Sequence, residues 1–423
     1  MAKLSISILG GGREVGRAAV IVSDGSHKVL FDYGIGLGED DIPILPLPAK
    51  PAELDLIAIT HSHLDHIGAA PFLYVSKRTP VLMTGLTRNL AQVMISDMLK
   101  LAGYYLPFEY PELNTMLESV VEAKLGSTVE VAGVQVDVFN AGHIPGSAMF
   151  RVELGNKYML YTGDVNTIDT KLVKGVELSG VEANTVIIES TYGNVDHPPR
   201  ELVEEEFLSI VKSVVEEGGR VLIPAFALGR SQEILCLLAE KMPYANVYYD
   251  GMARHIMEIL LNNPEGLNRI DLLEKAYRIF TPVTKSSMRR KILKERGAVI
   301  VTPAGMLKGG PALYYIKRMW SDKNSALIFV SFQAPSTPGR RVLEEGVFEE
   351  LGPKVQAKVR WFDFSSHAGV SGLIRILKSV KGLENVVVVH GNDPTAFDFA
   401  ALVEEELGVK VYVPSNGETL VID

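Results

Sequence analysis

The sequence predicts an α/β protein with two domains, the first of which is interrupted by the second. Short apolar strand patterns recur along the chain, and many of them end at a histidine, an acidic residue or a glycine. From about residue 196, helical and strand patterns alternate, which is typical of a parallel sheet covered by helices. Histidines return at strand ends beyond about residue 360. We therefore expect residues 1–195 and 361–423 to form one domain, with residues 196–360 inserted into it.

Length and composition fit this organisation. A chain of 423 residues with 47% hydrophobic content can bury a large core. No charged and apolar leader is recognisable at the start, and no apolar run reaches the roughly 20 residues of a membrane span, so a soluble cytoplasmic protein is expected. The one cysteine, Cys236, excludes an internal disulfide and lies in an apolar helical pattern, which favours a buried, inert thiol.

The charge distribution is uneven. The net charge of −9 argues against a broad electrostatic grip on nucleic acid. One stretch is nevertheless basic, and we call it the basic cluster: Lys285, Arg289, Arg290, Lys291, Lys294 and Arg296. Such a cluster is either a solvated helix face or a local contact surface, and the sequence leaves both interpretations open.

Residues 60–66, Thr-His-Ser-His-Leu-Asp-His, carry the strongest chemical signal in the chain. His61 and His63 point the same way in an extended backbone, whereas Asp65 and His66 fall where a helix begins. Imidazole nitrogens and carboxylate oxygens are preferred zinc donors, and this spacing suits two adjacent metal ions. The alternative, a polar loop with chance histidines, is disfavoured because three of the nine histidines lie within six residues.

Further ligand-type residues stand at the ends of predicted strands. They are Asp32, His143, Asp164, Glu189 and His390, and His367 precedes a predicted helix. Each alone could be a turn or capping residue. Ligand sites in layered α/β folds are built from loops at one end of the strands, so together with residues 61–66 they predict one shared site.

The remaining elements follow from periodicity. Helices are predicted over 67–77, 86–101, 114–121, 202–217 and 230–241, and strands over 4–9, 18–22, 29–31, 55–59, 81–84, 128–131, 134–139, 157–162, 186–188, 220–223, 246–249, 298–302, 326–330 and 385–389. The glycine-rich turn at 10–16 is followed by a strand, which argues against a dinucleotide-binding fingerprint.

In the inserted domain, loops that carry Gly305, Ser331, Gly339 and Arg340 follow two strands and are candidate phosphate cradles.

The motifs resemble a known family. Asp32, His61-x-His63-x-Asp65-His66, His143 and Asp164 are similar to the four motifs of the metallo-β-lactamase fold, an αββα sandwich with a two-zinc site. Glu189, His367 and His390 resemble three further motifs of its β-CASP nucleases, and residues 226–233, 250–253, 305–306 and 339–340 resemble the inserted β-CASP domain. Residues 12–16 look like archaeal and bacterial relatives of the cleavage and polyadenylation specificity factor nuclease, in a form without KH modules. Ser366 stands where a glycine is more usual.

This resemblance implies the roles of the site residues. One zinc ion would take His61, His63 and His143, the other Asp65, His66 and His390, and Asp164 would bridge them. Asp32 would orient a ligand or the water, and Asp65 would count among the catalytic residues as well. His367 would be the general acid, with Glu189 keeping it protonated.

The implied function is a zinc-dependent ribonuclease. A hydroxide activated by two metal ions would hydrolyse phosphodiester bonds of single-stranded RNA in the cleft between the domains. Endonucleolytic cleavage is expected, and the sequence leaves open whether 5′–3′ exonuclease activity accompanies it. No membrane partner is expected, and a homodimer or a larger RNA-processing complex is left open. Two alternatives remain: a hydrolase of the same fold acting on a small thioester or lactam, and a scaffold subunit of an RNA-processing complex.

Overall fold

The structure is a computed structural model that describes residues 4–38, 42–178, 180–348 and 354–422. The chain divides into two compact units. Unit 1 comprises Met1–Asp169, Lys174–Asp196 and Ser366–Asp423, and unit 2 comprises Thr170–Val173 and His197–Ser365. Besides the long insertion, a segment of four residues between two parts of unit 1 therefore belongs to unit 2.

Unit 1 contains two seven-stranded mixed sheets. The first has the order β22 (Thr419–Ile422), β1 (Leu4–Gly10), β2 (Ala19–Ser23), β3 (Lys28–Phe31), β6 (Leu56–Ala58), β7 (Val81–Thr84) and β8 (Val120–Ala123). The second has the order β21 (Lys410–Tyr412), β20 (Asn385–Val389), β13 (Thr185–Glu189), β12 (Lys157–Tyr161), β11 (Ala148–Leu154), β10 (Val134–Asn140) and β9 (Thr128–Val131). Strands β4 (Gly36–Leu37) and β5 (Pro43–Ile44) pair antiparallel in a separate two-stranded sheet.

The two sheets pack face to face through alternating apolar residues. In β1, Leu4, Ile6 and Ile8 are buried while the serines between them are partly exposed, as expected of a strand with one core face. These side chains join inward residues of the second sheet, such as Val136 and Phe150, in one apolar core. The sandwich is thus held by burial between its inner faces.

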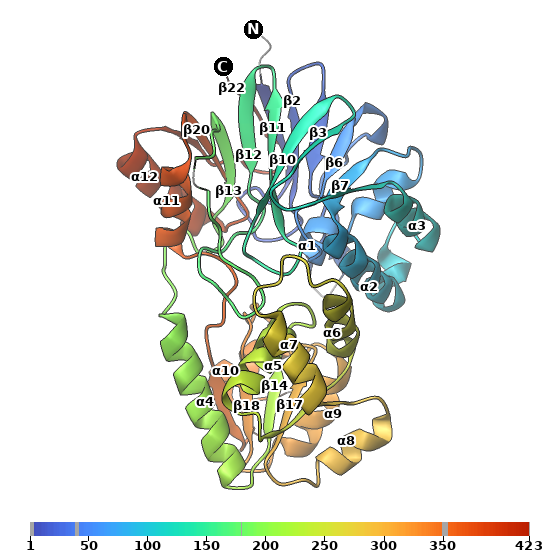
Figure 1. Ribbon diagram of the computed structural model, residues 1–423, viewed down its shortest axis with the longest axis vertical. Coiled ribbons are helices and arrows are strands. Elements are labelled where there is room, and N and C mark those ends of the chain that lie inside the picture. The colour runs from blue at the N-terminus through green and yellow to red at the C-terminus, as the bar shows by residue number, and fades with distance from the viewer. Residues whose placement is uncertain (1–3, 39–41, 179, 349–353, 423) are drawn as a thin grey trace. The chain divides into compact units, whose positions relative to one another are not determined.

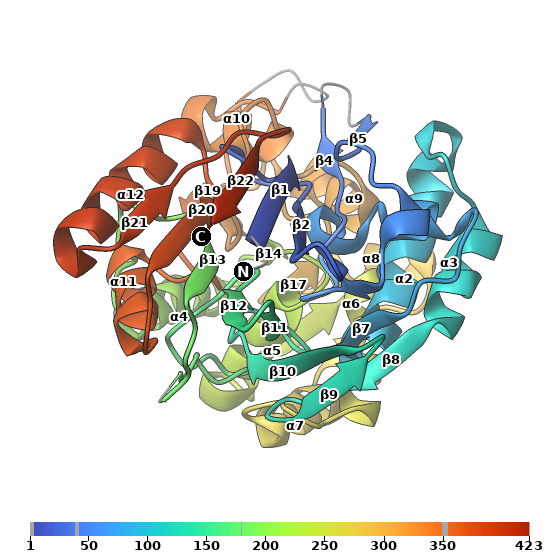
Figure 2. The ribbon, with the colours of Figure 1, turned by 90° about the horizontal axis from the view of Figure 1, so that it is seen from above.

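Helices cover the outer faces of both sheets. Figure 1 shows α2 (Gly85–Ala102) and α3 (Tyr110–Glu118) on one side, and α11 (Val370–Ser379) and α12 (Asp393–Leu407) on the other. Figure 2 shows the same layers from above. Each outer layer has its own apolar core. Short helices α1 (Leu64–Ile67), η2 (Pro51–Glu53), η3 (Ala70–Tyr74) and η4 (Gly103–Tyr105) complete unit 1. The predicted αββα sandwich is confirmed.

Unit 2 is built on a six-stranded sheet whose pairings are all parallel. Its order is β16 (Thr281–Pro282), β15 (Asn246–Tyr249), β17 (Ala298–Thr302), β14 (Val221–Pro224), β18 (Ala326–Phe329) and β19 (Lys358–Trp361). Its helices are α4 (Arg200–Glu216), α5 (Arg230–Lys241), α6 (Met252–Asn262), α7 (Ile270–Ile279), α8 (Ser286–Ile292), α9 (Gly310–Met319) and α10 (Pro338–Glu345). Helix α5 is buried along most of its length, and burial raises the pKa of its Cys236 thiol, which fits an inert role.

Some predicted elements were wrong. The helix predicted over 114–121 ends at Glu118, and Val120 and Val121 belong to β8, where β-branched residues pair with β7. The helix predicted over 67–77 is divided between α1 and η3, and Pro71 lies at the start of η3. Strands β4, β5, β11, β16, β19, β21 and β22 were not predicted. No helix within the described ranges combines the length and the apolar character that crossing a membrane requires.

Candidate metal centre

The ligand-type residues predicted from the sequence converge at one edge of unit 1. Asp32 follows β3, His61 follows β6 by three residues, and His143 follows β10. Asp164 follows β12, Glu189 ends β13 and His390 follows β20. Strands β12, β13 and β20 are parallel, so the residues at their carboxyl ends lie side by side.

The first group contains His61, His63, His143 and Asp164, whose ligand atoms all lie within 4.8 Å of one another. His63 Nδ1 is 3.2 Å from both His61 Nε2 and His143 Nε2. Asp164 Oδ2 is 3.6 Å from the Nε2 atoms of His61 and His143. Four donors thus point at a common centre.

The second group contains Asp65, His66 and His390 and adjoins the first through Asp164. Asp164 Oδ2 is 3.2 Å from His66 Nε2, and Asp164 Oδ1 is 3.3 Å from His390 Nδ1. His390 Nε2 is 3.5 Å from Asp65 Oδ2. Asp164 therefore faces both groups, as a bridging carboxylate would.

The donor set fits metal ions. His143 Nδ1 faces the Ser366 carbonyl at 2.9 Å and His66 Nδ1 faces Asp32 at 2.8 Å, so Nδ1 carries the proton in both rings and Nε2 is directed into the centre. His66 Nε2 and Asp164 Oδ1 are buried without a hydrogen bond of acceptable geometry to any described residue. Buried polar atoms of this kind need a partner, and a cation would satisfy both.

Asp32 supports the second group through its contact with the Nδ1 atom of His66. Its carboxylate is fully buried and accepts hydrogen bonds from the Thr60 backbone N–H, the Thr60 hydroxyl and the Tyr161 hydroxyl as well as from His66. Its backbone has a φ of +54°, and that of His390 a φ of +50°. Left-handed backbone is unusual for residues other than glycine and is often found at functional sites.

In the first group, the electrostatics favour the protonation states that bind metals. Burial lowers the pKa of His61 and His143 well below the usual value and that of His63 to about 4. Burial alone would raise the pKa of Asp164, but the neighbouring His66, His390 and His367 hold it well below its usual range. Neutral imidazoles and an ionised carboxylate are the forms that coordinate zinc. In the second group, burial opposes a proton, but the charge of Asp164 outweighs it and raises the pKa of His66 and of His390.

Glu189 and His367 form a separate pair beside Asp164. Both carboxylate oxygens of Glu189 lie 2.9 Å from His367 Nδ1, and His367 Nε2 is 3.9 Å from Asp164 Oδ2. Burial opposes a proton on His367, but the Glu189 charge, with Asp164, raises its pKa to about 9. Asp164, Glu189 and His367 also have the spacing of a metal group. Glu189 already accepts the Val165 and Thr191 N–H groups, however, which favours an orienting role.

The predicted phosphate-contacting residues lie in unit 2, after β17 and β18. Gly339 donates its N–H to the Met306 carbonyl, and a Cβ there would lie 1.9 Å from Gln333 Oε1, so this glycine serves close packing. Arg340 is exposed and pairs with Glu344. The Ser331 hydroxyl oxygen is buried and has no hydrogen-bond partner among the described residues. The Gly305 carbonyl accepts from Gln333.

The basic cluster is not uniform. Arg289 forms two hydrogen bonds, of 2.7 and 2.9 Å, with the buried Asp250 carboxylate, which also accepts from Tyr315. Arg290 and Lys291 are exposed. Arg289 is therefore a structural residue of unit 2, whereas the other two remain candidates for RNA contact.

Several residues at the centre were not identified from the sequence. The Ser366 carbonyl contacts His143, the Gly16 N–H donates to His390 Nε2 at 3.0 Å, and Thr60 and Tyr161 contact Asp32. The Ser366 carbonyl, the Gly16 N–H and the Thr60 N–H belong to the backbone, which carries no residue-type signal. Thr60 and Ser366 are sequence neighbours of His61 and His367, and this proximity was the one available hint.

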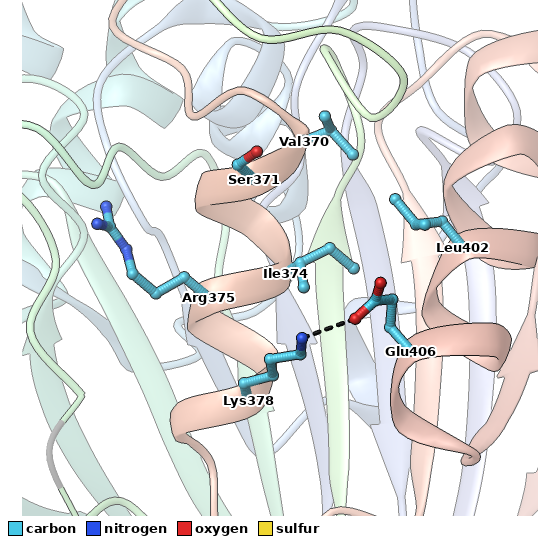
Figure 3. Close-up of a pocket in the computed structure, with 7 residues that line it drawn as sticks. All are labelled: Val370, Ser371, Ile374, Arg375, Lys378, Leu402 and Glu406. Atoms are coloured by element: carbon cyan, nitrogen blue, oxygen red, sulfur yellow. Dashed lines mark hydrogen bonds and ion pairs between the residues drawn. The ribbon is translucent and has the colours of Figure 1, made fainter.

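A groove of about 360 Å³ lies elsewhere in unit 1, between α11 and α12. Figure 3 shows Lys378 of α11 and Glu406 of α12 joined across it by an ion pair of 2.7 Å. The residues that line it are Val370, Ser371, Ile374, Arg375, Lys378, Leu402 and Glu406. None of the predicted site residues contributes to this groove.

An αββα sandwich with two histidine–aspartate groups at its strand ends defines a metallo-hydrolase of the β-lactamase type. Comparison with protein families agrees: residues 27–204 match a β-lactamase superfamily domain, residues 231–342 a β-CASP domain, and residues 352–414 a zinc-dependent metallo-hydrolase RNA specificity domain.

Curated relatives extend over nearly the whole chain. RNase aCSPSF2 of Saccharolobus solfataricus is 45% identical over 98% of this chain and 85% of its own length. Probable RNase MJ4 of Methanocaldococcus jannaschii is 36% identical over 93% of this chain and 94% of its own. Transcription termination factor FttA of the same organism is 32% identical over 98% of this chain and 71% of its own. The chain therefore belongs to the β-CASP ribonucleases of the metallo-β-lactamase superfamily, which are metal-dependent enzymes.

A solved structure shares the fold. The crystal structure of a protein of unknown function from Enterococcus faecalis V583 matches with a TM-score of 0.66 and 15% identity, covering 100% of both chains. At this identity the similarity concerns the fold alone.

Proposed function

We propose that this protein hydrolyses phosphodiester bonds of single-stranded RNA with two zinc ions per chain. The observation that carries the proposal is the placement of the Glu189–His367 pair beside Asp164, which faces both metal groups. A metal centre with an adjoining protonated imidazole provides for both halves of a hydrolysis, attack on phosphorus and departure of the ribose oxygen.

The residues divide between the two ions as their geometry suggests. His61, His63 and His143 would hold one ion, Asp65, His66 and His390 the other, and Asp164 would face both. When bound, the zinc ions supply activation of the attacking water and positive charge for the phosphate oxygens. Asp32 and the Ser366 carbonyl would keep the rings of His66 and His143 in the orientation and tautomer that a ligand needs.

His367 would protonate the leaving ribose oxygen. Its Nδ1 is held by Glu189, so Nε2 is the atom that can give up a proton toward the centre. Glu189 does not touch the reacting atoms in this scheme. It orients the ring and, through its charge, favours the protonated form.

RNA as the substrate is supported by the relatives and by unit 2. Two of the relatives described above are named as ribonucleases, and residues 352–414 match an RNA specificity domain. Gly305 and Ser331 stand in the loops after β17 and β18, and Gly339 and Arg340 lie in the first turn of α10. Loops with polar side chains and an arginine suit phosphate contacts. The proposal includes a cytoplasmic location and assembly as a homodimer or in a larger RNA-processing complex.

The test separates the acid from the ligands. We expect His367→Ala to retain its zinc and its RNA affinity while cleavage slows about 10²–10⁴-fold, the usual contribution of a positioned acid. His63→Ala is the matched control, since it removes an imidazole from the adjoining group and should lower zinc content. Metal analysis and single-turnover cleavage of one RNA measure both effects. Loss of zinc in His367→Ala would show that this residue is a ligand and would contradict the assignment.

The cleavage mode is tested with two RNAs of the same sequence. An endonuclease linearises a circular RNA, whereas a pure 5′–3′ exonuclease leaves it intact and releases nucleotides from a 5′-labelled linear RNA. We expect both substrates to be degraded. If the circular RNA is not cleaved, the endonuclease part of the proposal is wrong.

A further inference from the structure

The loop at residues 11–17, between β1 and β2, takes no part in the proposed reaction, although its Gly16 contacts His390. We call it the Glu14 loop: Gly11, Gly12, Arg13, Glu14, Val15, Gly16 and Arg17. It is the glycine-rich turn whose following strand argues against a dinucleotide-binding fingerprint. Its backbone is strained, because Arg13 has a φ of +56° and Arg17 a φ of +37°. Strain of this kind persists when surrounding contacts hold it in place.

The Glu14 loop contacts one of the two metal groups. The Gly11 carbonyl accepts the backbone N–H of His390 at 2.7 Å, and the Gly16 N–H lies 3.0 Å from the His390 ring. Ala18, the next residue after the loop, donates its N–H to the Asp65 carbonyl at 2.8 Å. Both ligands belong to the Asp65–His66–His390 group. The hydrogen bonds described for the Glu14 loop include none to His61, His63 or His143.

The Glu14 carboxylate holds this loop together. One oxygen accepts from Arg17 Nε at 2.6 Å, from Asn416 Nδ2 at 2.8 Å and from the Gly11 N–H at 3.4 Å, and the other accepts from Arg17 NH2 at 3.2 Å. These donors come from both ends of the loop and from the segment before β22. Without the carboxylate, two guanidinium donors, an amide and a backbone N–H would lose their shared acceptor.

The segment before β22 holds the other side of the Glu14 loop through hydrogen bonds. The Gly12 N–H donates to Asn416 Oδ1 at 2.8 Å, and Arg13 Nε donates to the Val413 carbonyl at 2.9 Å. A Cβ on Gly12 would lie 2.8 Å from backbone atoms of residues 414–416, so this residue has to be glycine for the segments to approach. The hydrogen bond between Glu14 and Asn416 thus joins the Glu14 loop to the segment before β22, close to His390.

We propose that Glu14 is a positioning residue for the metal ion held by Asp65, His66 and His390, and that it controls the affinity of this position selectively. The inference rests on the proposed two-metal arrangement. Residues that orient metal ligands typically change metal affinity about 10–100-fold when mutated. Because the Glu14 loop contacts His390 and Asp65, the effect should fall on one ion and spare the other.

The experiment is a zinc competition with a chelator of known affinity, on the full chain. Glu14→Ala should lower the affinity for one of the two bound zinc ions about 10–100-fold, which is the usual range for such residues. Glu14→Gln keeps an acceptor for Asn416 and Gly11 but not the bidentate pair with Arg17, so its effect should be smaller. Adding Glu14→Ala to Asp65→Ala should leave the remaining ion as tightly bound as in Asp65→Ala alone.

Asp137→Asn is the matched control. Asp137 pairs with Arg151 on the second sheet, with side chains 13% and 19% exposed against 31% and 24% for Glu14 and Arg17, and the hydrogen bonds and ion pairs described for it include none to a metal ligand. It should bind both ions as the wild type does. A Glu14→Ala protein that keeps both ions as tightly as Asp137→Asn, or that weakens both equally, overturns the proposal. A wild type with one ion per chain instead contradicts the two-metal arrangement.

Discussion

At the scale of single residues, the chemistry of the centre depends on which atom each histidine presents. The rings of His66, His143 and His367 each have Nδ1 engaged, by Asp32, the Ser366 carbonyl and Glu189 respectively. The same device therefore serves two purposes. Burial lowers the pKa of His143, which leaves its Nε2 unprotonated and ready to bind a metal, whereas the charges of Glu189 and Asp164 outweigh burial at His367 and favour a second proton there.

The Glu189–His367 pair predicts a pH effect. The Glu189 charge raises the pKa of His367, so the protonated imidazole is present at low pH and is lost as the pH rises through that pKa. Glu189→Gln lowers this pKa, and the alkaline limb of the cleavage profile should move about 1–2 pH units toward acid. Single-turnover rates across pH measure the limb. If the alkaline limb of the cleavage profile is unchanged in Glu189→Gln, the ionisation that it reports is not that of His367.

The residues that converge at the centre could be predicted from the sequence, but the groups that support them could not. His61, His63, Asp65 and His66 share one short motif, and the other ligands stand at strand ends, where chemistry-bearing residues gather. The groups that hold them are of a different kind. The Ser366 carbonyl and the Gly16 N–H are backbone atoms, and Tyr161 reads as an ordinary inward-facing strand residue. Their roles depend on contacts between distant segments, which no local pattern encodes.

At the scale of elements, predictions failed where tertiary pairing overrides local propensity. Val120 and Val121 continue a helical pattern but pair with β7 as an edge strand. Strand β22 has the pattern of a weak edge strand, yet it pairs with β1 at the opposite end of the chain, with Ile422 facing Leu4. By contrast, β13 and β20 were predicted because strands buried on both faces form continuous apolar runs.

Helix α8 predicts a stability difference between adjacent arginines. Arg289→Ala leaves the Asp250 carboxylate, which is 1% exposed, without its charged partner, and should lower the free energy of unfolding by about 2–4 kcal/mol. Arg290→Ala changes an exposed side chain and should stay within about 0.5 kcal/mol. Denaturant unfolding of both variants measures this, with RNA binding in parallel. Equal stabilities would show that the Asp250 contact contributes little.

At the scale of the whole molecule, the candidate metal ligands are confined to one of the two units. All ten predicted catalytic and metal residues belong to unit 1, whereas the parallel sheet of unit 2 carries none of them. The net charge of −9 gives the chain no general attraction for RNA. RNA binding would therefore depend on local positive charge, at the metal centre of unit 1 and on exposed residues of unit 2 such as Arg290.

Removing zinc should therefore destabilise one unit. Zinc that binds only the folded state stabilises it by about 4 kcal/mol at 1,000 times its dissociation constant, and without it the buried carboxylates and imidazoles of unit 1 face one another uncompensated. Calorimetry of the chelated protein should show a transition that moves to lower temperature and a second one that does not move. His63→Ala should shift the zinc-dependent transition without chelator. If a single transition shifts as a whole instead, the two units unfold cooperatively, and the effect of the metal is not confined to unit 1.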